Sequence, residues 1–128
     1  MTTTVGQYLA TRLEQIGLKH YFQVPGDYNL QLLDELLKNP NLEIMSCTNE
    51  LNAAYAAEGY ARANGASACI ITFNVGAFSA LNGVAGAYAE RLPMIFVSAG
   101  YNTNDEASGR HLHHTIGTTD YSLSLIHI

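Results

Sequence analysis

Four polar side chains of this 128-residue sequence could take part in proton transfer: Asp27, Glu50, His113 and His114. Histidine exchanges a proton near neutral pH, and a nearby carboxylate can hold one ready for transfer. Carboxylates and histidines that meet at one place are therefore typical of acid-base catalysis. These four residues are far apart in the sequence, so their meeting depends on the elements that carry them.

The chain alternates helical and strand-like patterns. Thr4 and Gln7 have the spacing of a capping box that would begin a first helix, and Gly17 would end it. Apolar residues at helical intervals predict helices over 5–16, 30–37, 50–63 and 77–91. Short apolar runs predict strands over 21–24, 42–47, 68–73 and 94–98, and we expect 102–105 to be a loop.

Strands that are apolar at nearly every position and separated by helices form parallel sheets. We therefore predict an α/β fold, a mostly parallel sheet with helices on both faces. In such sheets ligands bind beyond the carboxyl ends of the strands. Asp27, Glu50 and the histidine pair each follow a different predicted strand, so this fold would bring them to one edge.

Each of these residues also has an ordinary structural interpretation. Asp27 could cap the helix that follows it, and Glu50 could begin its helix because the helix dipole favours an anion there. His113 and His114 are adjacent and would point apart on regular structure, so a metal site formed by both would need an irregular loop. We expect no metal site in this chain. Glycine motifs for dinucleotides and lysine loops for triphosphates are absent from the sequence.

Composition narrows the classes of function. Hydrophobic residues make up 48% and charged residues 13% of the chain, against roughly a quarter charged residues in typical proteins, which argues against disorder. The net charge of −5 argues against a nucleic-acid partner. We expect no signal peptide and no membrane helix, and the two cysteines, both in apolar runs, predict reduced core thiols in a cytoplasmic protein. Such sparse charge predicts that further protein covers part of the surface.

Three segments, taken together and in order, resemble one enzyme family: VPGDYNL at 24–30, NELNAAYAAEGYAR at 49–62 and HHTIG at 113–117. They are similar to the amino-terminal, pyrimidine-binding domain of the pyruvate decarboxylases and the related indolepyruvate decarboxylases, which use thiamine diphosphate. The resemblance runs from about residue 4 to residue 121. We expect 1–121 to be a partial pyrimidine-binding domain, incomplete at its C-terminus, and 122–128 to be a non-family tail of artefactual origin from a truncated reading frame.

The resemblance implies specific roles for the residues around the cofactor. Glu50 matches the glutamate that hydrogen-bonds the pyrimidine ring nitrogen and assists proton withdrawal from the thiazolium carbon. Pro25 and Thr72 match loop contacts to the pyrimidine. In this family the cofactor spans a subunit interface, and a carboxy-terminal domain not contained in this sequence holds its diphosphate and Mg²⁺.

The same resemblance implies a carboxy-lyase that removes carbon dioxide from a 2-oxo acid. Asp27, His113 and His114 match the acid-base residues of the later protonation and aldehyde release, with Asp27 and His114 also against the substrate.

The function that the resemblance implies is that of a fragment of a decarboxylase that converts pyruvate to acetaldehyde and carbon dioxide. Indolepyruvate or phenylpyruvate decarboxylation is one alternative, and a free-standing binding or assembly domain without catalysis is another. The expected partners are the 2-oxo acid and further copies of the chain, in a homodimer or a dimer of dimers. We expect the isolated chain to be inactive, because nothing in it grips the diphosphate.

Overall fold

The computed structural model describes residues 2–116 of the chain. Its sheet has four parallel strands in the order β2-β1-β3-β4. The strands are β1 (His20–Gln23), β2 (Glu43–Ser46), β3 (Ser67–Thr72) and β4 (Met94–Ala99). The helices are α1 (Val5–Gln15), α2 (Leu30–Leu36), α3 (Glu50–Asn64), α4 (Val75–Ala89) and α5 (Thr103–Ser108).

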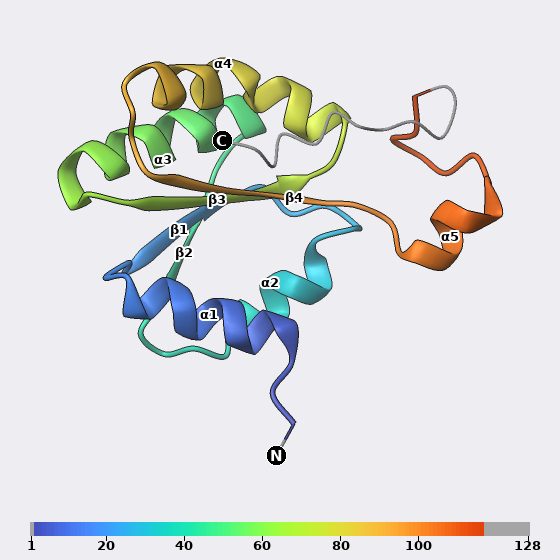
Figure 1. Ribbon diagram of the computed structural model, residues 1–128, viewed down its shortest axis with the longest axis horizontal. Helices are drawn as coiled ribbons and strands as arrows, with labels where there is room; N and C mark the ends of the chain where they lie inside the picture. Colours follow the sequence, from blue (N-terminus) through green and yellow to red (C-terminus); the bar gives the residue numbers. More distant parts are fainter. Residues whose placement is uncertain (1, 117–128) are drawn as a thin grey trace.

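Helices cover both faces of the sheet, with α1 and α2 on one side and α3 and α4 on the other (Figure 1). The predicted α/β class with a mostly parallel sheet is therefore confirmed. In residues 2–116, no helix has the length and apolarity that crossing a membrane requires.

The first helix begins and ends through the local signals that the sequence contains. The Thr4 hydroxyl accepts a hydrogen bond from the Gln7 amide at 3.1 Å, and the Gln7 side chain accepts one from the Thr4 amide at 3.3 Å. This is the predicted capping box. Gly17 follows the helix with φ +88°, a left-handed conformation that glycine adopts without strain.

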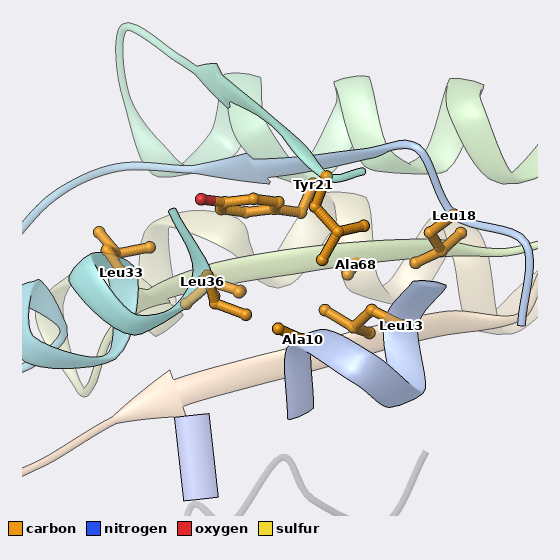
Figure 2. Close-up of a cluster of buried hydrophobic side chains, with 9 residues drawn as sticks. Ala10, Leu13, Leu18, Tyr21, Leu33, Leu36 and Ala68 are labelled. Carbon is orange, nitrogen blue, oxygen red and sulfur yellow. The ribbon is translucent and has the colours of Figure 1, made fainter. Parts of the chain in front are cut away.

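The face of the sheet under α1 and α2 has a core of large side chains, shown in Figure 2. Tyr21 of β1 is fully buried there, and Leu13 of α1 and Leu36 of α2 pack in the same cluster. The other members are Ala10, Leu18, Leu33, Leu42, Ala68 and Ile70. Burying large apolar side chains of this kind contributes about 1.5–3 kcal/mol each, so this face anchors the amino-terminal half of the fold.

The opposite face is packed with small residues instead. Ala53, Ala54 and Ala57 of α3 meet the sheet and Ala80 of α4 with no exposed surface. A Cβ added to Gly83 of α4 would lie 2.6 Å from the Ala54 Cβ, closer than real contacts allow. The alanine-rich sequence therefore sets a close approach of α3 to α4, and α3 is the helix that begins at Glu50.

The two cysteines differ in environment, and this predicts a difference in reactivity. Cys69 is fully buried in β3, and burial raises the pKa of its thiol to about 12. Cys47 is half-buried, so the prediction of a core thiol is confirmed for Cys69 and wrong for Cys47, although burial raises the pKa of Cys47 as well. Because the thiolate is the reactive form, we expect an alkylating reagent at mildly alkaline pH to modify Cys47 slowly and Cys69 only after denaturant is added. Mass spectrometry of labelled peptides would show this, and rapid labelling of Cys69 in the folded chain would contradict it.

One predicted segment is wrong. The expected loop at 102–105 is the start of helix α5, whose N-cap is Asn102. The Asn102 side-chain oxygen accepts hydrogen bonds from the amides of Asn104 and Asp105, both at 3.0 Å. None of the residues of α5 is buried, so the helix has no apolar periodicity to reveal it, and only its cap residue carried a signal.

Candidate functional site

The segments that follow the strands lie at the carboxyl edge of the sheet (Figure 1), and they carry the polar residues singled out by the sequence. Asp27 follows β1, Glu50 follows β2, and Thr72 is the last residue of β3. His113 and His114 lie beyond β4 and α5. Because all four strands are parallel, their carboxyl ends meet at one edge, and the candidate site is built from the segment that follows each strand.

One part of the site is a tight cluster around Thr72. A Cβ at Gly76 would lie 2.8 Å from the Thr72 methyl group and 3.2 Å from Glu50 Oε1. A Cβ at Gly26 would lie 3.2 Å from the Thr72 Cβ. The Thr72 hydroxyl is buried without a hydrogen-bond partner in residues 2–116. A buried polar group in this state is destabilising unless a further group binds it, so the cluster offers a free hydroxyl beside a half-buried carboxylate.

Glu50 is held in place by the start of α3. Its neighbour Asn49 is the N-cap, and the Asn49 side-chain oxygen accepts a hydrogen bond from the Asn52 amide at 2.9 Å. Glu50 is then the first helical residue, where the helix dipole favours a negative charge. The dipole interpretation and a role in a site are compatible, because the same position directs the carboxylate toward Gly76 and Thr72.

The turn after β1 is closed by Asn29, which is fully buried. Its side-chain oxygen accepts from the Gly26 amide at 2.8 Å, and its side-chain nitrogen donates to the Val24 carbonyl at 2.9 Å. Asn29 is also the N-cap position of α2, so the interpretation of Asp27 as the cap of this helix is wrong. Asp27 and Pro25 are exposed in the same turn.

Asp27 and its neighbour Tyr28 together contact both ring nitrogens of His113. The Asp27 Oδ2 atom lies 3.3 Å from His113 Nε2, an ion-pair distance when the ring is protonated. The Tyr28 hydroxyl lies 3.2 Å from His113 Nδ1 and donates to the His113 carbonyl at 3.2 Å, and the two rings stack with centroids 4.7 Å apart. Burial, and then the nearby carboxylates of Asp27 and Asp105, raise the pKa of Tyr28, so its hydroxyl keeps its proton.

His114 is fixed by a different set of contacts. Its carbonyl accepts a hydrogen bond from the Asn74 side chain at 2.7 Å, and its backbone has φ +70°. This irregular turn brings the His113 and His114 rings edge to face, 4.8 Å apart, where regular structure would point them in opposite directions. The Phe73 ring lies 5.9 Å from the His114 ring, and His114 Nδ1 is buried without a partner in residues 2–116.

Four contributors to this part of the site were missed by sequence reasoning: Tyr28, Asn29, Phe73 and Asn74. That reasoning considered charged residues and histidines, whereas these side chains act by stacking and by hydrogen bonds to the backbone. A signal was available, because all four lie one or two residues after Asp27 or Thr72, in the segments that follow β1 and β3. In the described part of the chain, no group of three or more His, Cys, Asp or Glu side chains is placed to hold a metal ion.

Residues 3–123 match the family model described as the thiamine pyrophosphate enzyme, N-terminal TPP binding domain. The chain belongs to this thiamine pyrophosphate enzyme family. Thiamine pyrophosphate is the thiamine diphosphate of the resemblance described above, so that resemblance is confirmed by the match. The match extends beyond residue 116, and the boundary expected at residue 121 stays a prediction because it lies outside the described residues.

Curated relatives of this thiamine pyrophosphate domain include pyruvate decarboxylases from fungi and plants. A probable pyruvate decarboxylase of Schizosaccharomyces pombe is 62% identical over 94% of this chain and 21% of its own length. The pyruvate decarboxylase of Neurospora crassa is 58% identical over 93% of the chain and 21% of its own. Pyruvate decarboxylase 2 of Arabidopsis thaliana is 55% identical over 95% of the chain and 20% of its own length. The chain thus spans about a fifth of the length of the relatives it matches.

The donor set at the sheet edge fits one half of thiamine pyrophosphate. Its aminopyrimidine ring carries nitrogen donors and acceptors, and the Thr72 cluster offers a carboxylate and an unpartnered buried hydroxyl. Gly26 and Gly76 pack closely against Thr72, where a side chain on either glycine would collide with it. Within residues 2–116 no cluster of acidic side chains is placed to bind a magnesium ion. Mg²⁺ therefore stays a prediction for a longer protein that contains this domain, called the longer protein below.

The contacts of Gly76 predict that Gly76→Ala weakens cofactor binding. The added methyl would press on Thr72 and Glu50 and displace both. We expect affinity for thiamine pyrophosphate to fall about tenfold or more, since about 1.4 kcal/mol of overpacking is enough for that change. A titration followed by intrinsic fluorescence in the longer protein measures it. Gly100→Ala is the matched control at the end of β4, where the nearest atom is 3.6 Å away; equal affinities of the two variants would contradict the prediction.

Proposed function

We propose that this chain supplies the pyrimidine-binding half of the active site of a pyruvate decarboxylase, which converts pyruvate to acetaldehyde and carbon dioxide. The observation that carries the proposal is 62% identity to a probable pyruvate decarboxylase over nearly the whole chain. The cluster of Glu50, Thr72 and Gly76 at the sheet edge supports it from the side of geometry. The full activity belongs to a longer protein, because the relatives are about five times the length of this match.

In this proposal Glu50 hydrogen-bonds the pyrimidine nitrogen and exchanges a proton with it. Bound thiamine diphosphate would supply the nucleophilic thiazolium carbon and the electron-accepting ring that decarboxylation of a 2-oxo acid requires. Glu50 is suited to its task because Asn49 and the start of α3 fix its backbone. The Thr72 hydroxyl and the turn at Pro25 orient the ring, and the Thr72 hydroxyl thereby gains the partner that it lacks here.

The second group of residues serves the protonation steps after carbon dioxide leaves. Asp27 and His113 form a pair that can carry and release a proton, and His114 stands beside them with its own ring. Asp27 and His114 lie against the substrate in this proposal. Tyr28 keeps the His113 ring in place through the opposite ring nitrogen and the stacking contact.

Further copies of the chain and a further domain complete the proposed enzyme. Several apolar side chains on the outer helices are exposed, among them Val75 at 53%, Tyr55 at 49% and Tyr88 at 66%. Their exposure supports a homodimer or a dimer of dimers through this domain. We further propose that Mg²⁺ binds with the diphosphate on a domain outside this chain, and that the protein is cytoplasmic.

A substrate panel on the longer protein tests the proposal. We expect the fastest turnover with pyruvate, followed as acetaldehyde production through a coupled dehydrogenase, and much slower turnover with phenylpyruvate and indolepyruvate. The isolated 128-residue chain with thiamine diphosphate and Mg²⁺ should produce no acetaldehyde. A longer protein that binds the cofactor but decarboxylates none of the three acids would contradict the proposal and favour a non-catalytic binding or assembly domain. No observation on the described residues supports that alternative.

A further inference from the structure

Asn74 occupies the junction between β3 and α4 in an unusual conformation. Its backbone has φ +48° and ψ −98°, in the half of conformational space that favours glycine, and its side chain is 7% exposed. Three residues other than glycine have positive φ in the described range, Asn74, Arg91 and His114. Two of these three, Asn74 and His114, are joined by a hydrogen bond of 2.7 Å from the side-chain nitrogen of Asn74 to the backbone carbonyl of His114.

The side chain of Asn74 does not serve the helix that it begins. An asparagine at an N-cap usually accepts a hydrogen bond from an amide of the first turn, but Asn74 makes no such bond in α4. Its backbone carbonyl still accepts from the Phe78 amide at 2.7 Å. The side chain is thus committed to a segment 40 residues further along the chain.

A strained backbone persists where the surrounding structure imposes it, and such positions gather at functional sites. Asn74 follows Thr72 and Phe73, which contribute to the two parts of the site, and it is separated from Gly76 only by Val75, the first residue of α4. The bond from Asn74 therefore links the junction beside the Thr72 cluster to the backbone that carries the His114 ring.

We infer that Asn74 is a positioning residue for His114. Its side-chain amide holds the backbone of His114 in the positive-φ conformation and thereby sets the direction of the imidazole. The imidazole packs against Phe73, His113 and Tyr28. Because asparagine tolerates positive φ better than most residues and also carries an amide donor, it meets both requirements of this junction. The inference rests on the proposed function only for its consequence in turnover, and its structural test is independent of turnover.

Two variants separate the hydrogen bond from the backbone strain. Asn74→Gly accepts the positive φ freely but removes the donor. Asn74→Asp keeps the size of the side chain but presents an acceptor to the His114 carbonyl, and it could cap α4 in the ordinary way. If Asn74 served only the helix junction, both variants would fold at least as stably as the original chain and leave the histidine signals unchanged.

The readout is the imidazole carbon-proton signal of His114 in the labelled 128-residue chain. His20 is the internal reference, because it lies at the other end of the sheet with Tyr60 and Glu43 as its neighbours. We expect the His114 signal to shift and broaden in both variants while the His20 signal and the Phe78 amide stay in place. Asn64→Gly is the matched control, since it removes a hydrogen bond from the Asn64 side chain to the Ala66 carbonyl at the far end of α3.

Turnover in the longer protein gives a second, separate readout. We expect Asn74→Gly to lower kcat about tenfold with little change in KM, because a misplaced proton-transfer group affects the reacting state more than binding. Asn64→Gly should leave both constants unchanged. Unchanged His114 signals in both Asn74 variants would overturn the inference. Changed signals in a longer protein without decarboxylase activity would keep the inference and overturn the proposed function instead.

Discussion

Replacement of Glu50 by glutamine in the longer protein is expected to slow hydrogen-deuterium exchange at the thiazolium carbon of bound thiamine diphosphate by about 10²-fold or more. Glutamine keeps the size of the side chain and its position at the start of α3, but it has no titratable proton to exchange with the pyrimidine. Exchange is measured by quenching in acid after mixing with deuterated buffer and recording the proton spectrum of the cofactor. This experiment isolates the activation step, because no substrate is present.

Glu58→Gln is the matched control for this experiment. Glu58 is on the same helix, two turns after Glu50, and forms an ion pair with Arg62 at 2.6 Å. Its side chain lies against Gly86 of α4, away from the Thr72 cluster. We expect its exchange rate and acetaldehyde production to match those of the original protein. Equal exchange in the Glu50 and Glu58 variants would remove Glu50 from the proposed role and return it to its helix-dipole interpretation.

The parts of the fold that were predictable are those with local signals. The capping box of Thr4 and Gln7 and the left-handed Gly17 fix α1 through residues that are neighbours in the chain. The apolar runs predicted the parallel sheet, because a strand that is buried on both faces shows no alternation of polar and apolar residues. β3 is such a strand, since every one of its residues is buried. The parallel sheet alone predicted that Asp27, Glu50 and the histidine pair lie at one edge.

The side-chain arrangement within that edge was not predictable in the same way. Tyr28 and His113 are 85 residues apart, and their bond depends on a turn geometry that Asn29 sets from inside the core. No spacing pattern reports such a contact. Likewise the edge-to-face rings of His113 and His114 follow from a positive φ that is imposed by the tertiary bond from Asn74.

The second large effect is expected on stability, at the contact between α3 and α4. A methyl group at Gly83 would lie 2.6 Å from the Ala54 Cβ, 3.0 Å from the Ala54 carbonyl carbon and 3.2 Å from the Tyr55 amide nitrogen. Two of these three atoms belong to the backbone of α3, which cannot rotate away as a flexible side chain would. We expect Gly83→Ala to lower the free energy of unfolding by about 1–3 kcal/mol, as overpacking of a filled core does.

Gly59→Ala provides the opposite expectation on the neighbouring helix. Gly59 is in the interior of α3 and a Cβ there would meet no atom within 4 Å. Alanine should therefore raise the free energy of unfolding by about 0.5–1 kcal/mol, because it lowers the entropy lost on helix formation. Urea unfolding of the chain and both variants, with equal m values, would measure the two changes.

The signs of the two changes in the free energy of unfolding show which interaction sets the spacing of α3 and α4. If helix propensity dominated, both substitutions would stabilise the chain. If the close approach dominates, as the distances at Gly83 indicate, only Gly59→Ala does so. The Gly83 variant should then also bind the cofactor more weakly, because Ala54 lies one helical turn after Glu50 and a displaced α3 moves that carboxylate. A stabilised Gly83→Ala variant with unchanged cofactor affinity would show that α3 is not positioned by this contact.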